Sequence, residues 1–134
     1  MRVLLDTNVI ISAILFGGVP RQAIEAALTG EIDLVTSPPL LAELEGVLSR
    51  RFSFPSTMAA LIRAEIESLS EVVEAAPIQQ VTRNAADDQV LAAAISADAE
   101  VIVTGDKELL ELKSYEGCRI EAPRSFIERL EKST

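Results

Sequence analysis

Val3-Leu4-Leu5-Asp6-Thr7-Asn8 and Val101-Ile102-Val103-Thr104-Gly105-Asp106 are two short apolar runs, far apart in the chain, that each lead into an acid. Runs of this kind are typical of strands buried on both faces of a parallel sheet. Functional groups in such sheets collect beyond the carboxyl ends of the strands, so we expect Asp6 and Asp106 to lie close together. Two carboxylates at that edge could hold a divalent metal ion.

The rest of the chain alternates between strand-like and helix-like segments. Strands are expected at 2–5, 32–36, 100–103 and 119–122, and 72–75 and 78–81 are open between strand and extended loop. Helix starts are expected after Asp6 or Thr7, at Pro20, after Ser37, after Ser56, after Asp87 or Asp88, after Asp106 and at Pro123. The alternation predicts one α/β domain over residues 1–134, a three-layer α/β/α sandwich around a mainly parallel sheet.

The composition narrows the chemistry that this domain can perform. Only 4% of the 134 residues are aromatic and 49% are hydrophobic, which predicts an aliphatic core. There is no histidine, which excludes Ser-His-Asp and Cys-His triads, and the single Cys118 excludes an intrachain disulfide and a cysteine-based zinc site. Oxygen ligands remain, and they favour Mg²⁺ or Mn²⁺.

Charge and hydropathy set expectations about partners and location. The net charge of −9 argues against a surface that coats nucleic acid in general, but it suits a basic protein partner. No apolar stretch approaches the roughly 20 residues that span a bilayer, and Asp6 interrupts the first apolar run too early for a signal peptide. We therefore expect a cytoplasmic protein that does not enter a membrane.

Each candidate acid also has a purely structural interpretation. Asp6 and Asp106 both stand where a helix N-cap is expected, and one carboxylate can serve as cap and as ligand. Asp87 and Asp88 open a helix, where acids are favourable against the helix dipole, so one could cap while the other reaches a metal ion.

Two glutamates on one predicted helix cannot be distinguished from the sequence pattern. Glu43 and Glu45 lie on opposite sides of the same apolar stripe, each about 100° from its centre. Either could be a solvated surface acid or a ligand. Arg50 and Arg51, at the end of this helix, complement its dipole or contact phosphate.

Four segments in this order resemble the PIN-domain ribonucleases: 3–9, 37–44, 87–92 and 102–110. The resemblance runs from residue 1 to about residue 127. It is greatest to the branch that comprises the toxins of toxin–antitoxin pairs, of which the VapC type is best known.

The resemblance implies a site of four acids that bind Mg²⁺ or Mn²⁺ and hydrolyse RNA phosphodiester bonds, leaving a 5′-phosphate and a 3′-hydroxyl. The matching positions are Asp6, Glu43, Asp88 and Asp106. Asn8 and Thr104 match supporting polar positions, and Asp87 is a substitute for Asp88. Relatives often carry an acidic, proline-containing run where this chain has Arg83-Asn84-Ala85-Ala86, so no extra ligand is expected from that loop.

The resemblance also implies partners, namely an RNA substrate, a small antitoxin protein and a second copy of the chain in a homodimer. The RNA sequence that is cleaved would depend on groove shape and on basic residues such as Arg21, Arg50, Arg51 and Lys107. The alternative within the same fold is a catalytically weak RNA-binding or protein-interaction module.

Two other classes of α/β protein fit the sequence less well. A haloacid-dehalogenase-like phosphatase needs a second acid two residues after the first, where this chain has Asn8. A receiver domain needs paired acids after its first strand, whereas Asp6 stands alone.

Overall fold

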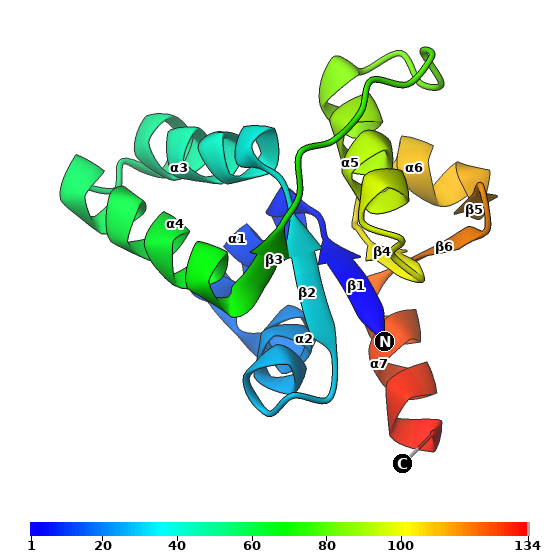
Figure 1. Ribbon diagram of the computed structural model, residues 1–134. Coiled ribbons are helices and arrows are strands. Elements are labelled where there is room, and N and C mark those ends of the chain that lie inside the picture. The colour runs from blue at the N-terminus through cyan, green and yellow to red at the C-terminus, as the bar shows by residue number, and fades with distance from the viewer. Residues whose placement is uncertain (134) are drawn as a thin grey trace.

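A computed structural model describes residues 1–133 and contains one six-stranded sheet with strand order β3-β2-β1-β4-β6-β5 (Figure 1). Five strands run parallel, and only β5 is antiparallel to its neighbour β6. The strands are β1 (Arg2–Leu5), β2 (Asp33–Thr36), β3 (Ser70–Val72), β4 (Val101–Val103), β5 (Ser114–Tyr115) and β6 (Cys118–Glu121). The mainly parallel sheet predicted from the apolar runs is thereby confirmed.

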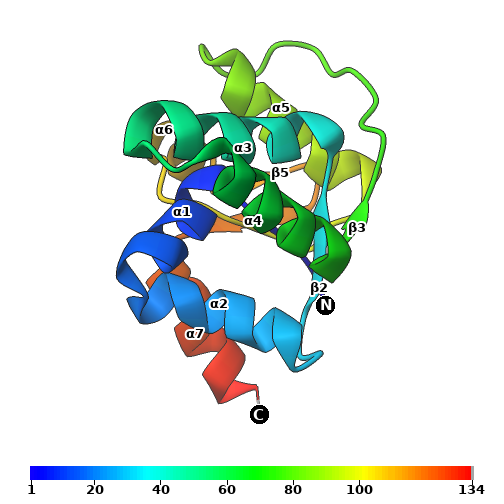
Figure 2. The same ribbon diagram turned by 90° about the vertical axis from the view of Figure 1, so that its left-hand side faces the viewer.

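Helices cover both faces of the sheet, as the three-layer prediction requires (Figures 1 and 2). Residues from α1, α2, α3, α4 and α7 pack on one face. Residues from α5 and α6, with Leu40 of α3, pack on the other. The helices are α1 (Thr7–Phe16), α2 (Gly18–Leu28), α3 (Pro38–Phe52), α4 (Ser56–Leu69), α5 (Ala85–Ser96), α6 (Lys107–Leu112) and α7 (Pro123–Lys132).

The strands contribute side chains to two hydrophobic cores, one on each face of the sheet. Side chains alternate across a strand, so Val3 enters the core under α1 and α2 while Leu4 enters the core under α5. Val103 and Ile102 alternate in the same way on β4. These side chains are almost wholly buried and aliphatic, as the composition indicates. The single domain over residues 1–134 stays a prediction.

The register of the sheet brings the two acid-bearing strand ends together. β1 lies between β2 and β4, and Leu5 pairs with Val103. The backbone N–H of Asp6 then donates to the carbonyl oxygen of Val103 over 2.9 Å. The residues that follow β1 and β4 therefore emerge side by side.

Two predicted helix starts need correction. Asn84, rather than Asp87 or Asp88, caps α5, because its side chain accepts from the N–H of Ala86 and the helix already begins at Ala85. Pro55 holds the cap position of α4, so Ser56 is the first helical residue instead of the cap.

Ser37 holds the cap position of α3 as predicted, but its side chain forms no capping hydrogen bond. Pro38 and Pro39 have no N–H to donate in the first turn.

Several strand boundaries also differ from the sequence expectation. The open ranges 72–75 and 78–81 contain the end of β3 at Val72 and otherwise no regular strand or helix. β5, with only two residues, was too short for its pattern to predict. Helix α2 ends at Leu28, two residues before Gly30.

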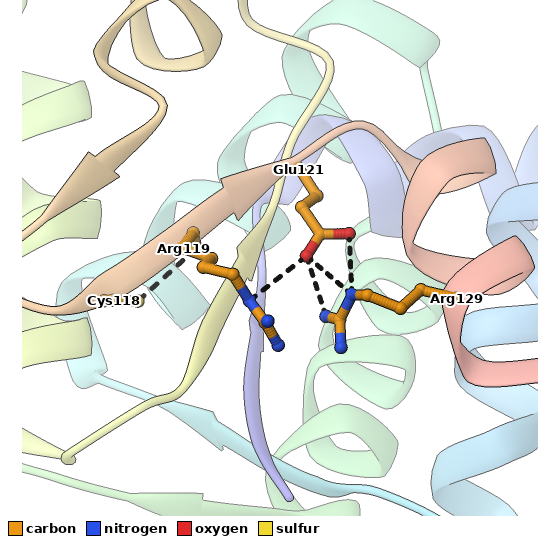
Figure 3. Close-up of polar contacts among 4 residues, drawn as sticks. All are labelled: Cys118, Arg119, Glu121 and Arg129. Carbon is orange, nitrogen blue, oxygen red and sulfur yellow. Dashed lines mark hydrogen bonds and ion pairs between the residues drawn. The ribbon is translucent and has the colours of Figure 1, made fainter. Parts of the chain in front are cut away.

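An ion pair between Glu121 of β6 and Arg129 links α7 to the sheet (Figure 3). Its carboxylate accepts from Nε of Arg129 at 3.0 Å and pairs with Nη2 of the same guanidinium at 2.7 Å. Arg119 approaches the same carboxylate at 3.4 Å. The Arg129 guanidinium also lies 5.9 Å from the ring centre of Phe126, so one arginine joins strand, helix and core.

None of the described helices alone has the length and hydropathy of a membrane span. Helices α1 and α2 meet those criteria only when taken together, and they are bent by 105° relative to each other.

Candidate metal centre

A pocket of about 310 Å³ opens at the carboxyl edge of the sheet, where β1 and β4 end. Helices α1 and α3, the start of α5 and the turn after β4 contribute to its wall. Its acidic lining residues are Asp6, Glu43, Asp87 and Asp106. Three of the four acids that the family resemblance implies thus lie around one pocket, together with Asp87.

Asp6 is a buried carboxylate at the end of β1, with 6% of its surface exposed. Oδ1 accepts from the N–H of Thr7 at 2.8 Å, and Oδ2 accepts from the hydroxyl of Thr104 at 2.7 Å and from the amide of Asn8 at 3.3 Å. The residue also occupies the N-cap position of α1. Three donors hold the carboxylate in one orientation toward the pocket.

Thr104 and Asn8 connect Asp6 to the turn that carries Asp106. The Thr104 hydroxyl donates to Asp6 and accepts from the N–H of Asp106 at 2.9 Å. The Asn8 side-chain oxygen accepts from the N–H of Gly105 at 3.2 Å. Asp106 in turn caps α6, with Oδ1 accepting from the N–H groups of Glu108 and Leu109.

The structure distinguishes the two glutamates of α3. Glu43 lines the pocket, and its Oε2 lies 3.5 Å from the hydroxyl of Thr7. Glu45 instead forms an ion pair with Arg63 of α4 at 3.0 Å. Of the two, only Glu43 is available to the site.

The family resemblance implies that Asp88 lies at the site, but in the structure Asp87 lies there instead. Asp88 turns away from the pocket and accepts from the N–H and the hydroxyl of Thr82, at 2.9 and 3.0 Å. Asp87 is buried to 6% exposure and lines the pocket. The structure therefore brings Asp87, and not Asp88, to the pocket with the other acids, because Asp88 holds the turn before α5 together.

The four pocket carboxylates repel one another. Burial and the charges of Asp106, Asp6 and Glu108 raise the pKa of Asp87 to about 6, and a hydrogen bond with Asp106 adds to the shift. Burial, opposed by hydrogen bonds from Thr104 and Thr7, raises the pKa of Asp6. Burial and the charge of Asp6 raise the pKa of Glu43. Such a cluster favours a bound cation, which would offset the repulsion.

The donor set fits a hard divalent cation. All four side chains offer carboxylate oxygens, the ligands that Mg²⁺ and Mn²⁺ prefer. Oδ2 of Asp87 is buried and has no hydrogen-bond donor, so it is a free ligand atom. Within residues 1–133, no three acidic side chains are already close enough together to hold an ion, so binding would require the carboxylates to converge.

The sequence interpretation missed several residues of the pocket. Asn84 lines it next to Asp87, and Phe16 and Phe52 line its outer part at the ends of α1 and α3. Asn84 had a signal, because asparagine is a favoured cap before a helical pair such as Ala85-Ala86. The two phenylalanines had none, since each ends a helix and only the packing of α1 beside α3 brings them to one pocket.

Comparisons with known proteins agree with this architecture. No curated protein sequence matches the chain. Among solved structures, a chain in the crystal structure of VapBC2 from Rickettsia felis, bound to a DNA fragment from their promoter, superimposes with a TM-score of 0.65. The two chains are 17% identical, and the match covers 91% of this chain and 98% of the other, which is a likeness of fold. The profile of the PIN domain family matches residues 2–108. The chain therefore belongs to the PIN domain family.

Proposed function

We propose that this protein is a ribonuclease that depends on Mg²⁺ or Mn²⁺ and hydrolyses RNA phosphodiester bonds. The single observation that carries the proposal is the gathering of four carboxylates, Asp6, Glu43, Asp87 and Asp106, around one pocket at the carboxyl edge of the sheet. Membership of the PIN domain family supports the nuclease chemistry. The absence of histidine leaves oxygen ligands as the means of metal binding.

Some residues around the pocket orient the carboxylates, and the carboxylates themselves would bind the metal ion. Thr104 and Asn8 orient the Asp6 carboxylate, and the cap on α6 orients Asp106. Asp87 and Glu43 approach from α5 and α3, on the other sides of the pocket. The four acids would hold the ion and, through it, place the scissile phosphate.

A divalent ion bound there would supply an acidified water for attack on phosphorus and positive charge opposite the phosphate oxygens. Without that cation the acidic pocket would repel the RNA backbone. Metal binding and substrate binding are therefore expected to be coupled.

We further propose that the protein is the toxin of a toxin–antitoxin pair, acts in the cytoplasm and forms a homodimer. The fold it shares with a chain of VapBC2 supports the toxin assignment. The net charge of −9 suits a basic antitoxin segment that covers the acidic pocket. Recovery of the native protein without any bound small protein would argue against the pair, and a monomer in light scattering would argue against the dimer.

The test is RNA cleavage by the purified protein with Mn²⁺ or Mg²⁺, compared between wild type and three single substitutions of acids. We expect Asp87→Asn and Asp6→Asn to lose at least 100-fold in rate, while Asp88→Asn keeps most of it. Wild-type products should carry a 5′-phosphate. Cleavage that persists unchanged in Asp6→Asn would mean that the activity resides elsewhere.

The alternative of a weak RNA-binding or interaction module has one observation in its favour, namely that the carboxylates do not yet form a metal-binding group. It predicts that metal neither binds tightly nor changes RNA turnover. The cleavage assay separates it from the ribonuclease, because the module would bind RNA without releasing products.

A further inference from the structure

The pocket extends beyond its acids into an outer part of different character. On α3, Glu43, Val47 and Arg51 follow one another at four-residue spacing and all line the pocket. Helical rise places the last of them about 12 Å along the axis from the first. On α1, Ile11 and Leu15 form the facing stripe. The pocket thus continues from the carboxylates along the groove between two helices.

Two aromatic rings and one cation close this outer part. Phe16, the last residue of α1, is 82% exposed, and Phe52, the last residue of α3, is 42% exposed. Both line the pocket. Arg51 is exposed beside them, is the one cation among the described lining residues, and forms no ion pair or hydrogen bond within residues 1–133.

Phe16 and Phe52 leave apolar ring surface open to water at the outer part of the pocket, where a bound apolar group would cover it. Flat aromatic faces beside an unpaired guanidinium match the two surfaces of a nucleotide, namely a base that stacks and a phosphate that pairs with a cation. The outer part of the pocket also lies where a nucleotide next to the scissile phosphate is expected. A scissile phosphate held at the carboxylates must have a neighbouring nucleotide, and the outer part is the continuation of the same pocket.

We propose that the outer part of the pocket, formed by Phe16, Phe52 and Arg51, holds an unpaired nucleotide next to the scissile phosphate of a single-stranded RNA. The base stacks on the phenylalanine faces, and Arg51 binds the adjoining phosphate. This inference rests on the proposed ribonuclease function and adds the residues that bind the nucleotide next to the cleaved bond. Stacking tolerates any base, so this contact contributes affinity with little sequence preference.

The first test uses Mn²⁺ throughout. It measures the Kd of a fluorescent single-stranded RNA that has a non-hydrolysable linkage at the scissile bond, and the KM for cleavage of the natural RNA. Phe16→Leu keeps the apolar character but loses the flat ring, and we expect roughly a tenfold rise in Kd and KM with little change in kcat. Phe16→Trp should restore binding. The matched control is Leu28→Ala, which alters an exposed apolar residue that also ends a helix, is 67% exposed and lies outside the pocket.

The role of Arg51 is tested against a control arginine on another helix. Arg51→Ala should reduce the slope of log Kd against log salt concentration by about one, the signature of a lost phosphate contact. Arg124→Ala removes the same charge from an exposed residue of α7 that does not line the pocket, and should leave the slope nearly unchanged.

An RNA with an abasic site beside the cleaved bond tests whether the base itself contacts the phenylalanine rings. Wild type should bind it as weakly as Phe16→Leu binds the intact RNA, and the two losses should not add. If Phe16→Leu and Arg51→Ala bind and cleave RNA like wild type, the nucleotide subsite is overturned, and the outer part is left to a protein partner. That result would leave the ribonuclease proposal standing, since the latter is tested separately by cleavage in the wild type and its loss in Asp6→Asn.

Discussion

Thr104 is a wholly buried residue whose hydroxyl joins the two strand-end acids. Replacement by valine keeps the shape but leaves the buried Asp6 carboxylate without its shortest hydrogen bond. We expect Thr104→Val to lower the free energy of unfolding by about 1–3 kcal/mol, measured by urea denaturation. Thr36→Val is the control, because that buried threonine forms no side-chain hydrogen bond in the described chain. Equal losses in both variants would show that the contact with Asp6 adds nothing.

The raised pKa of Asp87 predicts how the metal-free protein responds to pH. Its pKa of about 6 in the folded state lies above the ordinary value of 3.8, so the folded protein holds a proton that the unfolded chain has released between those values. The free energy of unfolding should therefore fall as pH rises from about 4 to 6 and remain lower above that range.

Asp87→Asn removes this penalty, so in EDTA at pH 8 it should be more stable than wild type by about 1–3 kcal/mol. The gain should shrink toward pH 4, where wild type is also neutral at this position. Thermal and urea unfolding at both pH values measure the difference. A variant that is less stable than wild type at pH 8 would contradict the assigned repulsion.

At the scale of elements, the turn before α5 decides which of two adjacent acids reaches the pocket. Asp88 binds Thr82 and so fixes the turn, and Asp87 then faces Asp106. We expect Asp88→Ala to lower stability by about 1–2 kcal/mol yet leave the affinity for Mn²⁺ within a few-fold of wild type.

Asp87→Asn should do the opposite, with higher stability and an affinity for Mn²⁺ at least tenfold lower. Isothermal titration calorimetry on the two variants measures the contrast. A larger loss of Mn²⁺ affinity in Asp88→Ala than in Asp87→Asn would restore the family-based assignment.

Elements with a strong pattern were predictable from the sequence, and those that depend on packing were not. The apolar runs that end at Asp6 and Asp106 predicted β1, β4 and their shared edge, because a buried parallel strand requires a continuous apolar run. Asp87 and Asp88 could not be separated in this way. Neighbours on a helix point about 100° apart, and which one meets the pocket depends on how α5 rests on the sheet.

At the scale of the whole molecule, a net charge of −9 and a cluster of four acids predict that divalent cations stabilise the fold. Mn²⁺ at about 100 times its Kd should add about 2.7 kcal/mol to the free energy of unfolding, well beyond NaCl at the same ionic strength. Asp6→Asn should lose most of that increment. An equal effect of NaCl would indicate general screening of charge instead of a metal site.

The central claim is that Asp6, Glu43, Asp87 and Asp106 form one metal site. The most direct measurement is a crystal structure of the protein with Mn²⁺, using anomalous scattering to locate the ion. We predict an anomalous peak in the pocket within about 2.5 Å of carboxylate oxygens of Asp6, Asp87 and Asp106, with Glu43 bound directly or through water. A pocket without such a peak at saturating Mn²⁺, or a peak at Asp88 in place of Asp87, would contradict the account.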